Sequence, residues 1–241
     1  SLSQTQSKAT LLEKFHNSSI PSLVNVKSFD TPNYTKALTI NLSDQSILDL
    51  VFLTTSPITP LRYSLAKGSN DYKQSVNAIA MSTATTALSG SLVSGQFVGS
   101  LTSTNDLLFW DTLGNMKCIE ANATVFSTCA LTIETIFKFS KVHAVDINQD
   151  MRSDLIFTGA VSESANSTSV LIYINSGGNF LYLNQIIGDP NNQINASIIQ
   201  DMSGDGLPDL LIAKSNGVLE YYEQLHNNQF DFHQALQSET A

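Results

Sequence analysis

The sequence has little of what marks several common protein classes. No run of 18 apolar residues occurs, so we expect no membrane-spanning helix in this segment. Only 12 residues are basic against 21 acidic ones, and the formal net charge of −9 argues against nucleic acid as a partner, because phosphate recognition needs a basic surface. No segment keeps a 3.6-residue apolar period over three turns, which argues against a helical protein. With 42% hydrophobic residues the chain still has enough apolar side chains for a packed core.

Motifs of the common enzyme classes are also missing. The sequence contains no HExxH, no GxSxG and no glycine-rich phosphate loop. The four histidines, His16, His143, His226 and His233, show no metal-ligand spacing. His143 alternates with valines in an expected strand, as a structural histidine would. We therefore expect no enzymatic activity, and a propeller hydrolase or lyase is the least favoured alternative.

A nine-residue acidic pattern occurs twice, at 146–154 and 201–209, and each copy runs into an apolar segment. Oxygen-bearing side chains stand at the first, third, fifth and ninth positions of both copies. Ca²⁺ takes six to eight oxygen ligands, and a short loop with alternate ligands can curl around it. The alternative is that Asp, Asn, Ser and Gly are simply turn-forming residues.

The acidic pattern belongs to a longer repeat. An Asp-Leu-apolar-apolar signature begins at Asp49, Asp106, Asp154 and Asp209. After each signature come a second apolar segment and a polar turn with an aromatic residue, which is Tyr72, Phe126, Phe180 or Phe230. Repeats of about 50 residues with several short strands indicate a propeller or a solenoid. The sequence therefore predicts an all-β fold, a β-propeller segment of about four four-stranded blades that forms part of a larger propeller, and the aromatic residues are expected in the cores between blades.

These residues resemble the FG-GAP/VCBS repeat family, the blades of integrin-α-like propellers, over about residues 31–241. An ectodomain of the T-cell immunomodulatory protein type is one member that the pattern resembles. The resemblance is specific in the third and fourth units and depends mainly on the period in the first two. It implies an extracellular or lumenal interaction or adhesion scaffold. Residues 1–30 are expected to form a polar N-terminal extension, in which 10–16 could make one helical turn.

The prediction is two structural Ca²⁺ sites in units three and four and two metal-free loops in units one and two. The expected ligands of the first site are Asp146, Asn148, Asp150, Asp154 and the carbonyl of Arg152. Those of the second site are Asp201, Ser203, Asp205, Asp209 and the carbonyl of Leu207. Met151 stands where the family has glycine, so a positive φ there would be costly. Asp49 and Asp106 are expected to accept backbone hydrogen bonds in their turns instead of binding metal.

Two weak signals favour a location outside the cytosol. Cys118 and Cys129 flank a turn and could form a disulfide, with two free thiols as the alternative. Six N-glycosylation sequons occur, at Asn17, Asn33, Asn41, Asn122, Asn166 and Asn195. The first residues show no basic segment followed by an apolar stretch, so no signal peptide is expected within this sequence, and a mature secreted chain would look the same.

The partner is expected to be a protein or further propeller blades, with glycan as an alternative. A propeller lectin could stack a sugar on Trp110, Tyr221 or Tyr222. For Trp110 a place in the core is favoured, because lone aromatic residues in strands usually pack inside.

Overall fold

The structure is a computed structural model that describes residues 7–15, 22–31, 34–40, 49–54, 60–65, 72–74, 90–98, 105–111, 116–121, 126–129, 132–133, 139–160, 167–226 and 228–237. Every secondary-structure element in these ranges is a β-strand, which confirms the predicted all-β class. Among the described residues none belongs to a helix long and apolar enough to cross a membrane.

Four antiparallel sheets follow one another along the chain, and we call them blades 1 to 4. Blade 1 contains β3 (Tyr34–Ile40), β4 (Asp49–Thr54), β5 (Pro60–Leu65) and β6 (Tyr72–Gln74). Blade 2 contains β7 (Gly90–Gly95), β8 (Asp106–Asp111), β9 (Met116–Ala121) and β10 (Phe126–Cys129). Blade 3 contains β12 (Phe139–Val145), β13 (Asp154–Ala160), β14 (Thr168–Ser176) and β15 (Asn179–Ile187). Blade 4 contains β16 (Ile194–Gln200), β17 (Asp209–Lys214), β18 (Val218–Gln224) and β19 (Phe230–Gln237).

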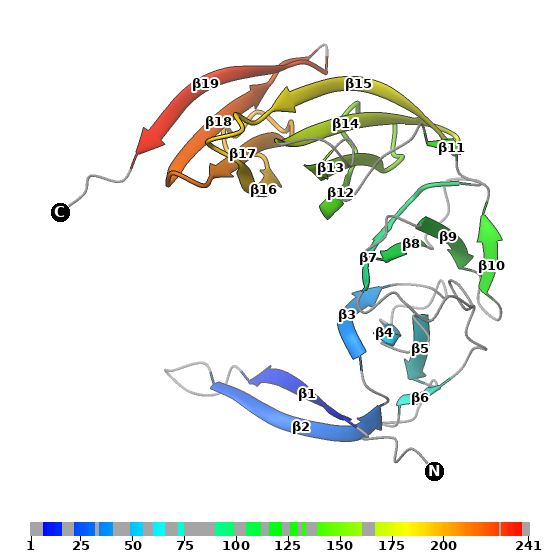
Figure 1. The fold of residues 1–241 in the computed structure, drawn as a ribbon. Coiled ribbons are helices and arrows are strands. Elements are labelled where there is room, and N and C mark those ends of the chain that lie inside the picture. Colours follow the sequence, from blue (N-terminus) through cyan, green and yellow to red (C-terminus); the bar gives the residue numbers. More distant parts are fainter. Residues whose placement is uncertain are drawn as a thin grey trace.

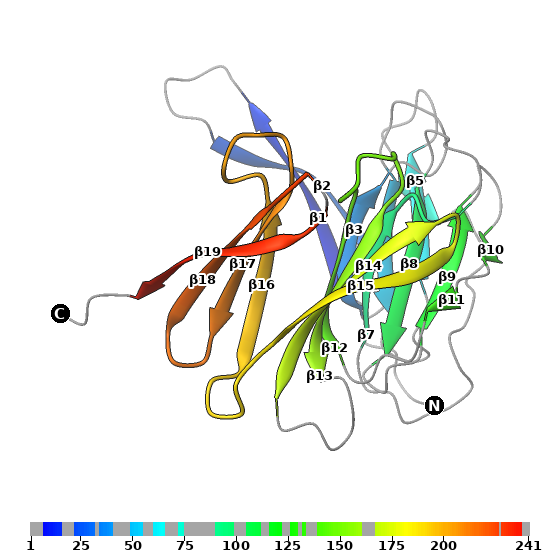
Figure 2. The ribbon, with the colours of Figure 1, turned by 90° about the horizontal axis from the view of Figure 1, so that it is seen from above.

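The blades stand side by side along an arc (Figure 1). Their first strands, β3, β7, β12 and β16, lie on the inner side of this arc, and the later strands of each blade lie further out. The view from above shows the sheets twisted against one another (Figure 2), as right-handed strand twist requires. This arrangement is a segment of a β-propeller, as the period predicted.

The repeated signature has a fixed place in every blade. Asp49, Asp106, Asp154 and Asp209 are each the first residue of the second strand. The apolar residues that follow the aspartate are buried in blade 3 from Leu155 to Phe157. A strand that is covered on both faces reads as a continuous apolar run instead of an alternating one.

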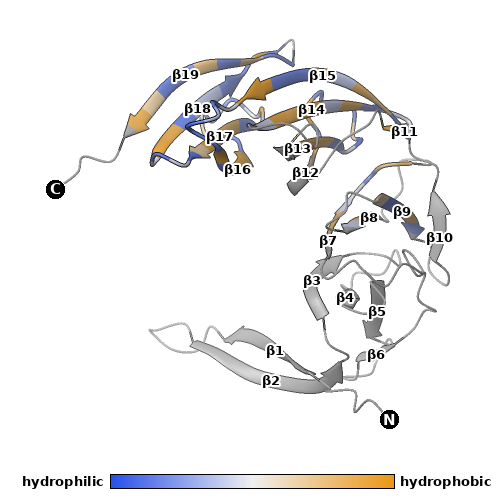
Figure 3. Cartoon of the chain, viewed as in Figure 1, coloured by the Kyte–Doolittle hydropathy of each residue, from blue (hydrophilic) through white to orange (hydrophobic). Residues whose placement is uncertain are grey.

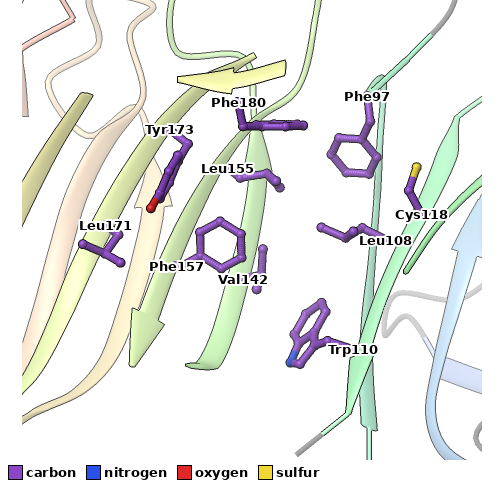
Figure 4. Packing of buried hydrophobic residues seen from close by; sticks show 10 residues of the cluster. All are labelled: Phe97, Leu108, Trp110, Cys118, Val142, Leu155, Phe157, Leu171, Tyr173 and Phe180. Carbon is purple, nitrogen blue, oxygen red and sulfur yellow. The ribbon is translucent and has the colours of Figure 1, made fainter. Parts of the chain in front are cut away.

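The core lies between neighbouring blades. One buried cluster joins blades 2 and 3, with Phe97, Leu108 and Trp110 on one side and Leu155 and Phe157 on the other (Figure 4). A second cluster joins blades 3 and 4 through Ile147, Ile156, Val170, Ile172, Ile194, Leu210, Ile212 and Phe230. Successive residues of β13 thus point to opposite neighbours, as strand geometry demands.

The aromatic residues of the third and fourth units, Phe180 and Phe230, are buried in these two clusters, which confirms their predicted place. The side chains of Tyr72 and Phe126 lie outside the part of the chain that can be described.

Two elements lie outside the four-stranded pattern. The short β11 (Thr132–Ile133) adds to the outer edge of blade 3, parallel to β15. Near the N-terminus, β1 (Ser7–Phe15) and β2 (Ser22–Thr31) form a separate antiparallel hairpin. The helical turn expected at 10–16 is therefore wrong, because β1 pairs with β2 along its whole length, and pairing outweighs a weak local propensity. The boundary between an extension and the propeller near residue 30 stays a prediction.

Candidate functional site: two acidic loops on adjoining blades

The two acidic loops occupy the same position in adjoining blades and lie next to each other. Loop 146–154 joins β12 to β13, and loop 201–209 joins β16 to β17. The side-chain amide of Gln149 donates to the carbonyl of Gly206 over 3.4 Å, so the two loops contact each other directly. Four carboxylates, those of Asp146, Asp150, Asp201 and Asp205, are thereby collected at one end of blades 3 and 4.

In the first loop, side-chain oxygens accept hydrogen bonds from backbone amides of the same loop. The carboxylate of Asp146 accepts from the amides of Asp150 at 3.1 Å and Met151 at 2.8 Å. Asp150 in turn accepts from the amide of Arg152 at 2.8 Å, and Asn148 donates to Asp150 at 3.2 Å. The oxygen atoms of the first, third and fifth positions are therefore turned toward the inside of the loop.

The second loop repeats this arrangement. Asp201 accepts from the amides of Gly204 at 2.7 Å and Gly206 at 3.0 Å, and Asp205 accepts from the amide of Leu207 at 2.9 Å. The bond from Gly206 to Asp201 corresponds to the bond from Met151 to Asp146. The two loops share one backbone design although only the aspartates are common to both.

Both loops need two residues with positive φ. In the second loop these are Gly204 at 82° and Gly206 at 87°. The first loop has Gln149 at 60° and Met151 at 67° in the same places. Met151, which stands where the family has glycine, therefore keeps the positive φ of the glycine that it replaces. Side chains with a Cβ adopt this conformation at a cost, so the first loop is held by its surroundings against a local penalty.

The ninth-position aspartates are fully buried and anchor the loops to their blades. Asp154 accepts from the amides of Ile147 and Asn175, both at 2.7 Å. Asp209 accepts from the amides of Met202, Ser203 and Gln224 and from the hydroxyl of Tyr221, at 2.9 to 3.0 Å. Each carboxylate thus bonds both to the start of its loop and to the end of the third strand of the same blade.

The two anchors differ in their electrostatics. Burial raises the pKa of Asp154 to about 6, and the neighbouring Asp150 and Asp146 raise it further, although two backbone hydrogen bonds oppose the shift. Burial also acts to raise the pKa of Asp209, but its larger set of hydrogen bonds outweighs it and the pKa is lowered. Desolvation of the partly buried Tyr221 and its hydrogen bond to Asp209 raise the pKa of its hydroxyl to about 12. The hydrogen bonds of Asp209 thus favour its ionised form, whereas the burial of Asp154 favours its protonated form.

Asp106 shows the same anchor in blade 2. Its carboxylate accepts from the amides of Phe97 at 3.0 Å and Val98 at 2.9 Å. This confirms the expected role of an aspartate that closes a turn. The corresponding side chain of Asp49 in blade 1 is not among those that can be described.

The donor chemistry of both loops fits a hard cation. Carboxylate, carboxamide, hydroxyl and carbonyl oxygens are the ligands that Ca²⁺ takes in proteins. Within the described residues, however, no three His, Cys, Asp or Glu side chains converge on one point. The anchor aspartates explain this, because their oxygens are directed at backbone amides inside the blade. A cation would therefore rest mainly on the first, third and fifth positions and the seventh carbonyl.

Sequence reasoning missed a pair of amide side chains that join the blades. Asn175 donates to the carbonyl of Phe97 at 3.0 Å, and Gln224 donates to the carbonyl of Ile147 at 2.7 Å. Each amide stands at the end of the third strand of one blade and reaches the first loop of the blade before it. We call this contact the amide clasp. The sequence contained only a loose signal, since Asn175 stands five residues before Phe180 and Gln224 six residues before Phe230. The register makes the two positions equivalent, because each pairs with the aromatic residue of its unit.

A shallow hollow of about 480 Å³ opens beside the first loop. Asn148, Asp150 and Arg152 line it from the loop, and Ile174 and Leu181 supply apolar surface from β14 and β15. Leu181 is 61% exposed. Charged, amide and apolar groups therefore meet at this point on the surface.

The aromatic residues considered for sugar stacking are not free platforms. Trp110 is 4% exposed and packs in the core between blades 2 and 3, as favoured from the sequence, so it cannot stack on an external ligand. Tyr221 is bonded to Asp209, and Tyr222 to Glu220 at 2.9 Å. The three positions do not form one surface site.

The expected structural role of His143 is confirmed. Its Nε2 lies 3.0 Å from both the hydroxyl and the carbonyl oxygen of Ser197 on β16, so the imidazole joins blades 3 and 4. Burial and the neighbouring charge of Lys141 lower the pKa of His143 to about 4. Of the other histidines, His226 and His233 are exposed and His16 lies outside the described residues.

The modification sites can be placed only in part. Cys118 and Cys129 are direct partners in the register of β9 and β10, which is a spacing that a disulfide can span. Asn195 is exposed on β16. The sequons at Asn17, Asn33, Asn41, Asn122 and Asn166 fall outside the described residues.

Comparison with known proteins agrees with this architecture. Residues 146–212 match the family described as FG-GAP-like repeat, which confirms the resemblance for the two loops and the strands between them. The narrower resemblance to an ectodomain of the T-cell immunomodulatory protein type gains no support. No curated protein matches the chain.

Among solved structures, the chain is similar to a lectin from Agrocybe aegerita whose structure is described as the basis of specific recognition of non-reducing terminal N-acetylglucosamine. The two share 11% sequence identity with a TM-score of 0.55, over 97% of this chain and 66% of that one. The chain thus spans just under two thirds of the length of that structure. A likeness at this identity shows the fold.

Proposed function

We propose that this chain is a calcium-binding β-propeller segment that acts as a non-enzymatic protein-interaction or adhesion scaffold in an extracellular or lumenal compartment. The observation that carries the proposal is the pair of acidic loops, which share one backbone design on adjoining blades and contact each other through Gln149 and Gly206. Each loop places two carboxylates in one turn, and a bound cation would offset the repulsion between them.

The first site would use the side chains of Asp146, Asn148 and Asp150 with the carbonyl of Arg152, and the remaining lone pairs of Asp154. The second would use Asp201, Ser203 and Asp205 with the carbonyl of Leu207, and Asp209 would contribute less because it already accepts four hydrogen bonds. Bound Ca²⁺ would neutralise the clustered carboxylates and hold the loop ends rigid. The role of the metal would be structural.

The way in which the blades are joined supports the proposed scaffold role. The amide clasps, the buried aspartate anchors and the apolar clusters make blades 2 to 4 one stiff surface. Loops held at the end of such a surface can present side chains to a partner with little loss of conformational entropy on binding. Calcium would complete that surface on blades 3 and 4.

Isothermal calorimetry with Ca²⁺ tests the proposal loop by loop. The chain should bind two equivalents, and the double variants Asp146→Ala/Asp150→Ala and Asp201→Ala/Asp205→Ala should each lose one. Asp189→Asn/Asp231→Asn, which changes two exposed aspartates elsewhere, is the matched control and should keep both equivalents. Absence of binding heat with the wild-type chain under conditions that give heat with a known calcium protein would overturn the proposal.

An oxidising compartment would allow the bridge between Cys118 and Cys129 that the register of β9 and β10 favours. Intact mass measured on secreted protein, with and without reduction, should differ by the two hydrogens of one disulfide. Equal masses, with both thiols alkylated before reduction, would contradict this part of the proposal.

Glycan binding is a second candidate, and the hollow beside the first loop is the observation that favours it. Asp150 and Arg152 can bond to sugar hydroxyls while Leu181 packs on the apolar face of the ring. The fold is shared with a lectin described as recognising terminal N-acetylglucosamine. A glycan array probed with the chain and with Arg152→Ala and Leu181→Asp tests this. Signal lost in both variants supports a sugar in the hollow, and an array without signal for the wild-type chain disposes of it.

A further inference from the structure

The outer strand of blade 3, β15, exposes several large apolar side chains. Its nine residues include no charged residue, no proline and no glycine. Figure 3 shows it on the outer side of the arc, with hydrophobic stretches on both sides of a short hydrophilic one. Four apolar side chains of this strand are exposed, namely Leu181 (61%), Tyr182 (49%), Leu183 (38%) and Ile187 (64%). Exposed apolar side chains gathered on one strand are typical of an interaction site.

The outer strands of the other blades have protection that β15 lacks. β6 is three residues long and includes Lys73, and β10 is four residues long. β19 is longer, but it carries Asp231 and His233, and Nδ1 of His233 lies 3.2 Å from the carboxylate of Glu223. Short length and charge are devices by which sheet edges avoid pairing with other chains. The edge of blade 3 is long and uncharged, so it is the one best suited to pairing among these four.

A strand from outside the blade already pairs with the beginning of this edge. β11 lies parallel to β15, with Thr132 and Ile133 opposite its first two residues. The amide of Thr132 donates to the carbonyl of Gly178 over 3.1 Å, and Ile133 packs against the buried cluster between blades 2 and 3. The edge thus binds an extended segment both by backbone hydrogen bonds and by an aliphatic side chain. From Leu181 onward, β14 is the only described strand that lies beside β15.

Two local features shape the rest of the edge. Leu183 forms a bulge, because it has no partner in the register with β14, and four residues in regular pairing follow it. The amide of Gln185 donates to the side chain of Asn184 over 2.7 Å, so a strand that pairs there has to displace this bond. The bulge limits regular pairing of an added strand to residues 184–187 and leaves Leu181 and Tyr182 for side-chain contacts.

The exposed ring of Tyr182 is held in place from the core. It meets the ring of Tyr173 edge to face at 5.7 Å, and Tyr173 meets the ring of Phe157 in the same way at 5.7 Å. Tyr182 pairs with Tyr173 and Ile187 pairs with Ser169, so Tyr182 and Ile187 lie on the same face of the sheet. An ordered tyrosine loses little conformational entropy on binding, which is a property of the aromatic residues that dominate interfaces.

We propose that the outer edge of β15, from Leu181 to Ile187, is a docking site for an extended segment of a partner protein, which adds to blade 3 as a further strand and packs uncharged aliphatic side chains on Tyr182 and Ile187. Continuity with the pairing of β11 selects a strand over a helix or a small ligand. The lack of charge on β15 selects uncharged side chains, because burying a charge against apolar surface is costly.

In this mode of recognition, main-chain hydrogen bonds supply affinity and alternate side chains supply specificity. The inference rests on the proposed scaffold role, to which it gives a place and a mode of binding. It does not depend on calcium.

Selection from a phage-displayed library of short random peptides tests the proposal on the whole chain, immobilised in the presence of a chelator. The selected peptides should carry aliphatic residues at alternate positions and no charge between them. A synthetic peptide of the most enriched sequence should slow the hydrogen exchange of the fastest amides in 181–187 by at least about ten-fold, because these amides gain a strand partner. Exchange in β19, read by mass spectrometry in the same experiment, should not change.

A matched pair of variants makes the result specific. Tyr182→Lys/Ile187→Lys places two charges on the proposed surface and should weaken binding of the synthetic peptide by at least about ten-fold. Phe232→Lys/Leu236→Lys makes the same changes at 55% and 47% exposed residues of β19 and should bind as wild type does. The exchange map of the wild-type chain remains a test if the first variant does not fold.

Three results would overturn the proposal. The first is a selection that enriches no sequence over the support without the chain. The second is a set of peptides that protects a segment other than 181–187. The third is a chain that sediments as a dimer and becomes a monomer in Tyr182→Lys/Ile187→Lys, since the occupant would then be a second copy. Binding heat with Ca²⁺ in a chain that selects no peptide would leave the calcium proposal standing and overturn this inference alone.

Discussion

The side-chain amide of Gln224 donates a 2.7 Å hydrogen bond to the carbonyl of Ile147, 77 residues earlier in the chain. This contact joins the end of the third strand of blade 4 to the acidic loop of blade 3. Asn175 makes the equivalent contact to Phe97 one blade earlier. The acidic loop of blade 3 therefore has two roles, since it holds carboxylates at the surface and accepts a hydrogen bond from the next blade on its inner side.

Replacing Gln224 with leucine should destabilise the chain by about 1–2 kcal/mol, because the buried carbonyl of Ile147 loses its donor. The Oε1 atom of Gln224 has no hydrogen-bond partner, which keeps the cost near the lower value. Urea unfolding measures the change. Gln200→Leu, an exposed position on β16, is the matched control and should stay within about 0.5 kcal/mol of wild type. Equal stability of both variants would show that the clasp contributes nothing.

Asp209→Asn should cost more than Asp154→Asn when both are measured without calcium. Asp209 accepts four hydrogen bonds and Asp154 accepts two, and an amide group would turn a donor toward backbone donors. We expect a loss of about 3 kcal/mol or more at Asp209 and about 2 kcal/mol at Asp154. Asp231→Asn on the exposed side of β19 serves as the control. The opposite order in urea unfolding would contradict the anchor role derived from these bonds.

Met151→Gly should stabilise the chain slightly or leave its stability unchanged. Release of the positive φ at Met151 gains about 1–2 kcal/mol, and the added freedom of glycine in the unfolded chain takes back about 0.4–1 kcal/mol. The reverse change at the matching position, Gly206→Met, should destabilise by up to about 1.5 kcal/mol, because the penalty for a positive φ is partly offset by the lower entropy of the unfolded chain. Thermal unfolding of the two variants tests the pair. A destabilising Met151→Gly would mean that the loop depends on contacts of the methionine side chain.

Acid should weaken the contact between blades 3 and 4 at His143. Its pKa is lowered to about 4 in the folded chain, so between about pH 6.5 and pH 4 the unfolded chain binds more protons than the folded one. The contribution of His143 to stability is therefore present above about pH 6.5 and is lost as the pH falls toward 4. Asp154, with its pKa raised to about 6, acts with the opposite sign in nearly the same window.

The comparison of wild type with His143→Gln separates these two effects. Urea unfolding from pH 7 to pH 4.5 should show a stability difference that shrinks as the pH falls, because the variant lacks the titrating group. A difference that stays constant across this range would refute the assignment.

Much of this architecture could be read from the sequence because it repeats. The four aspartate signatures gave the start of the second strand in each blade, and the aromatic residue after the turn gave Phe180 and Phe230 as core residues. The resemblance placed Met151 where the family has glycine, but that the loop keeps a positive φ there is shown only by the structure. Each of these is a local feature, fixed by residues close together in the chain.

Contacts between blades could not be read in the same way. The pairing of Asn175 with Phe97 and of His143 with Ser197 depends on how two sheets are placed in space. The different roles of the first and ninth positions were also hidden, since both are aspartates in the pattern. Only the hydrogen bonds show that Asp154 and Asp209 face the blade while Asp146 and Asp201 face the loop.

Thermal unfolding with Ca²⁺ and with a chelator tests the central claim most directly. A ligand that binds only the folded chain must raise the melting temperature, and at 100 times the dissociation constant we expect a rise of at least about 5 °C. Asp146→Ala/Asp205→Ala, which changes one ligand in each loop, should melt at the same temperature with and without Ca²⁺. A wild-type chain whose melting temperature is equal in both buffers would contradict the account.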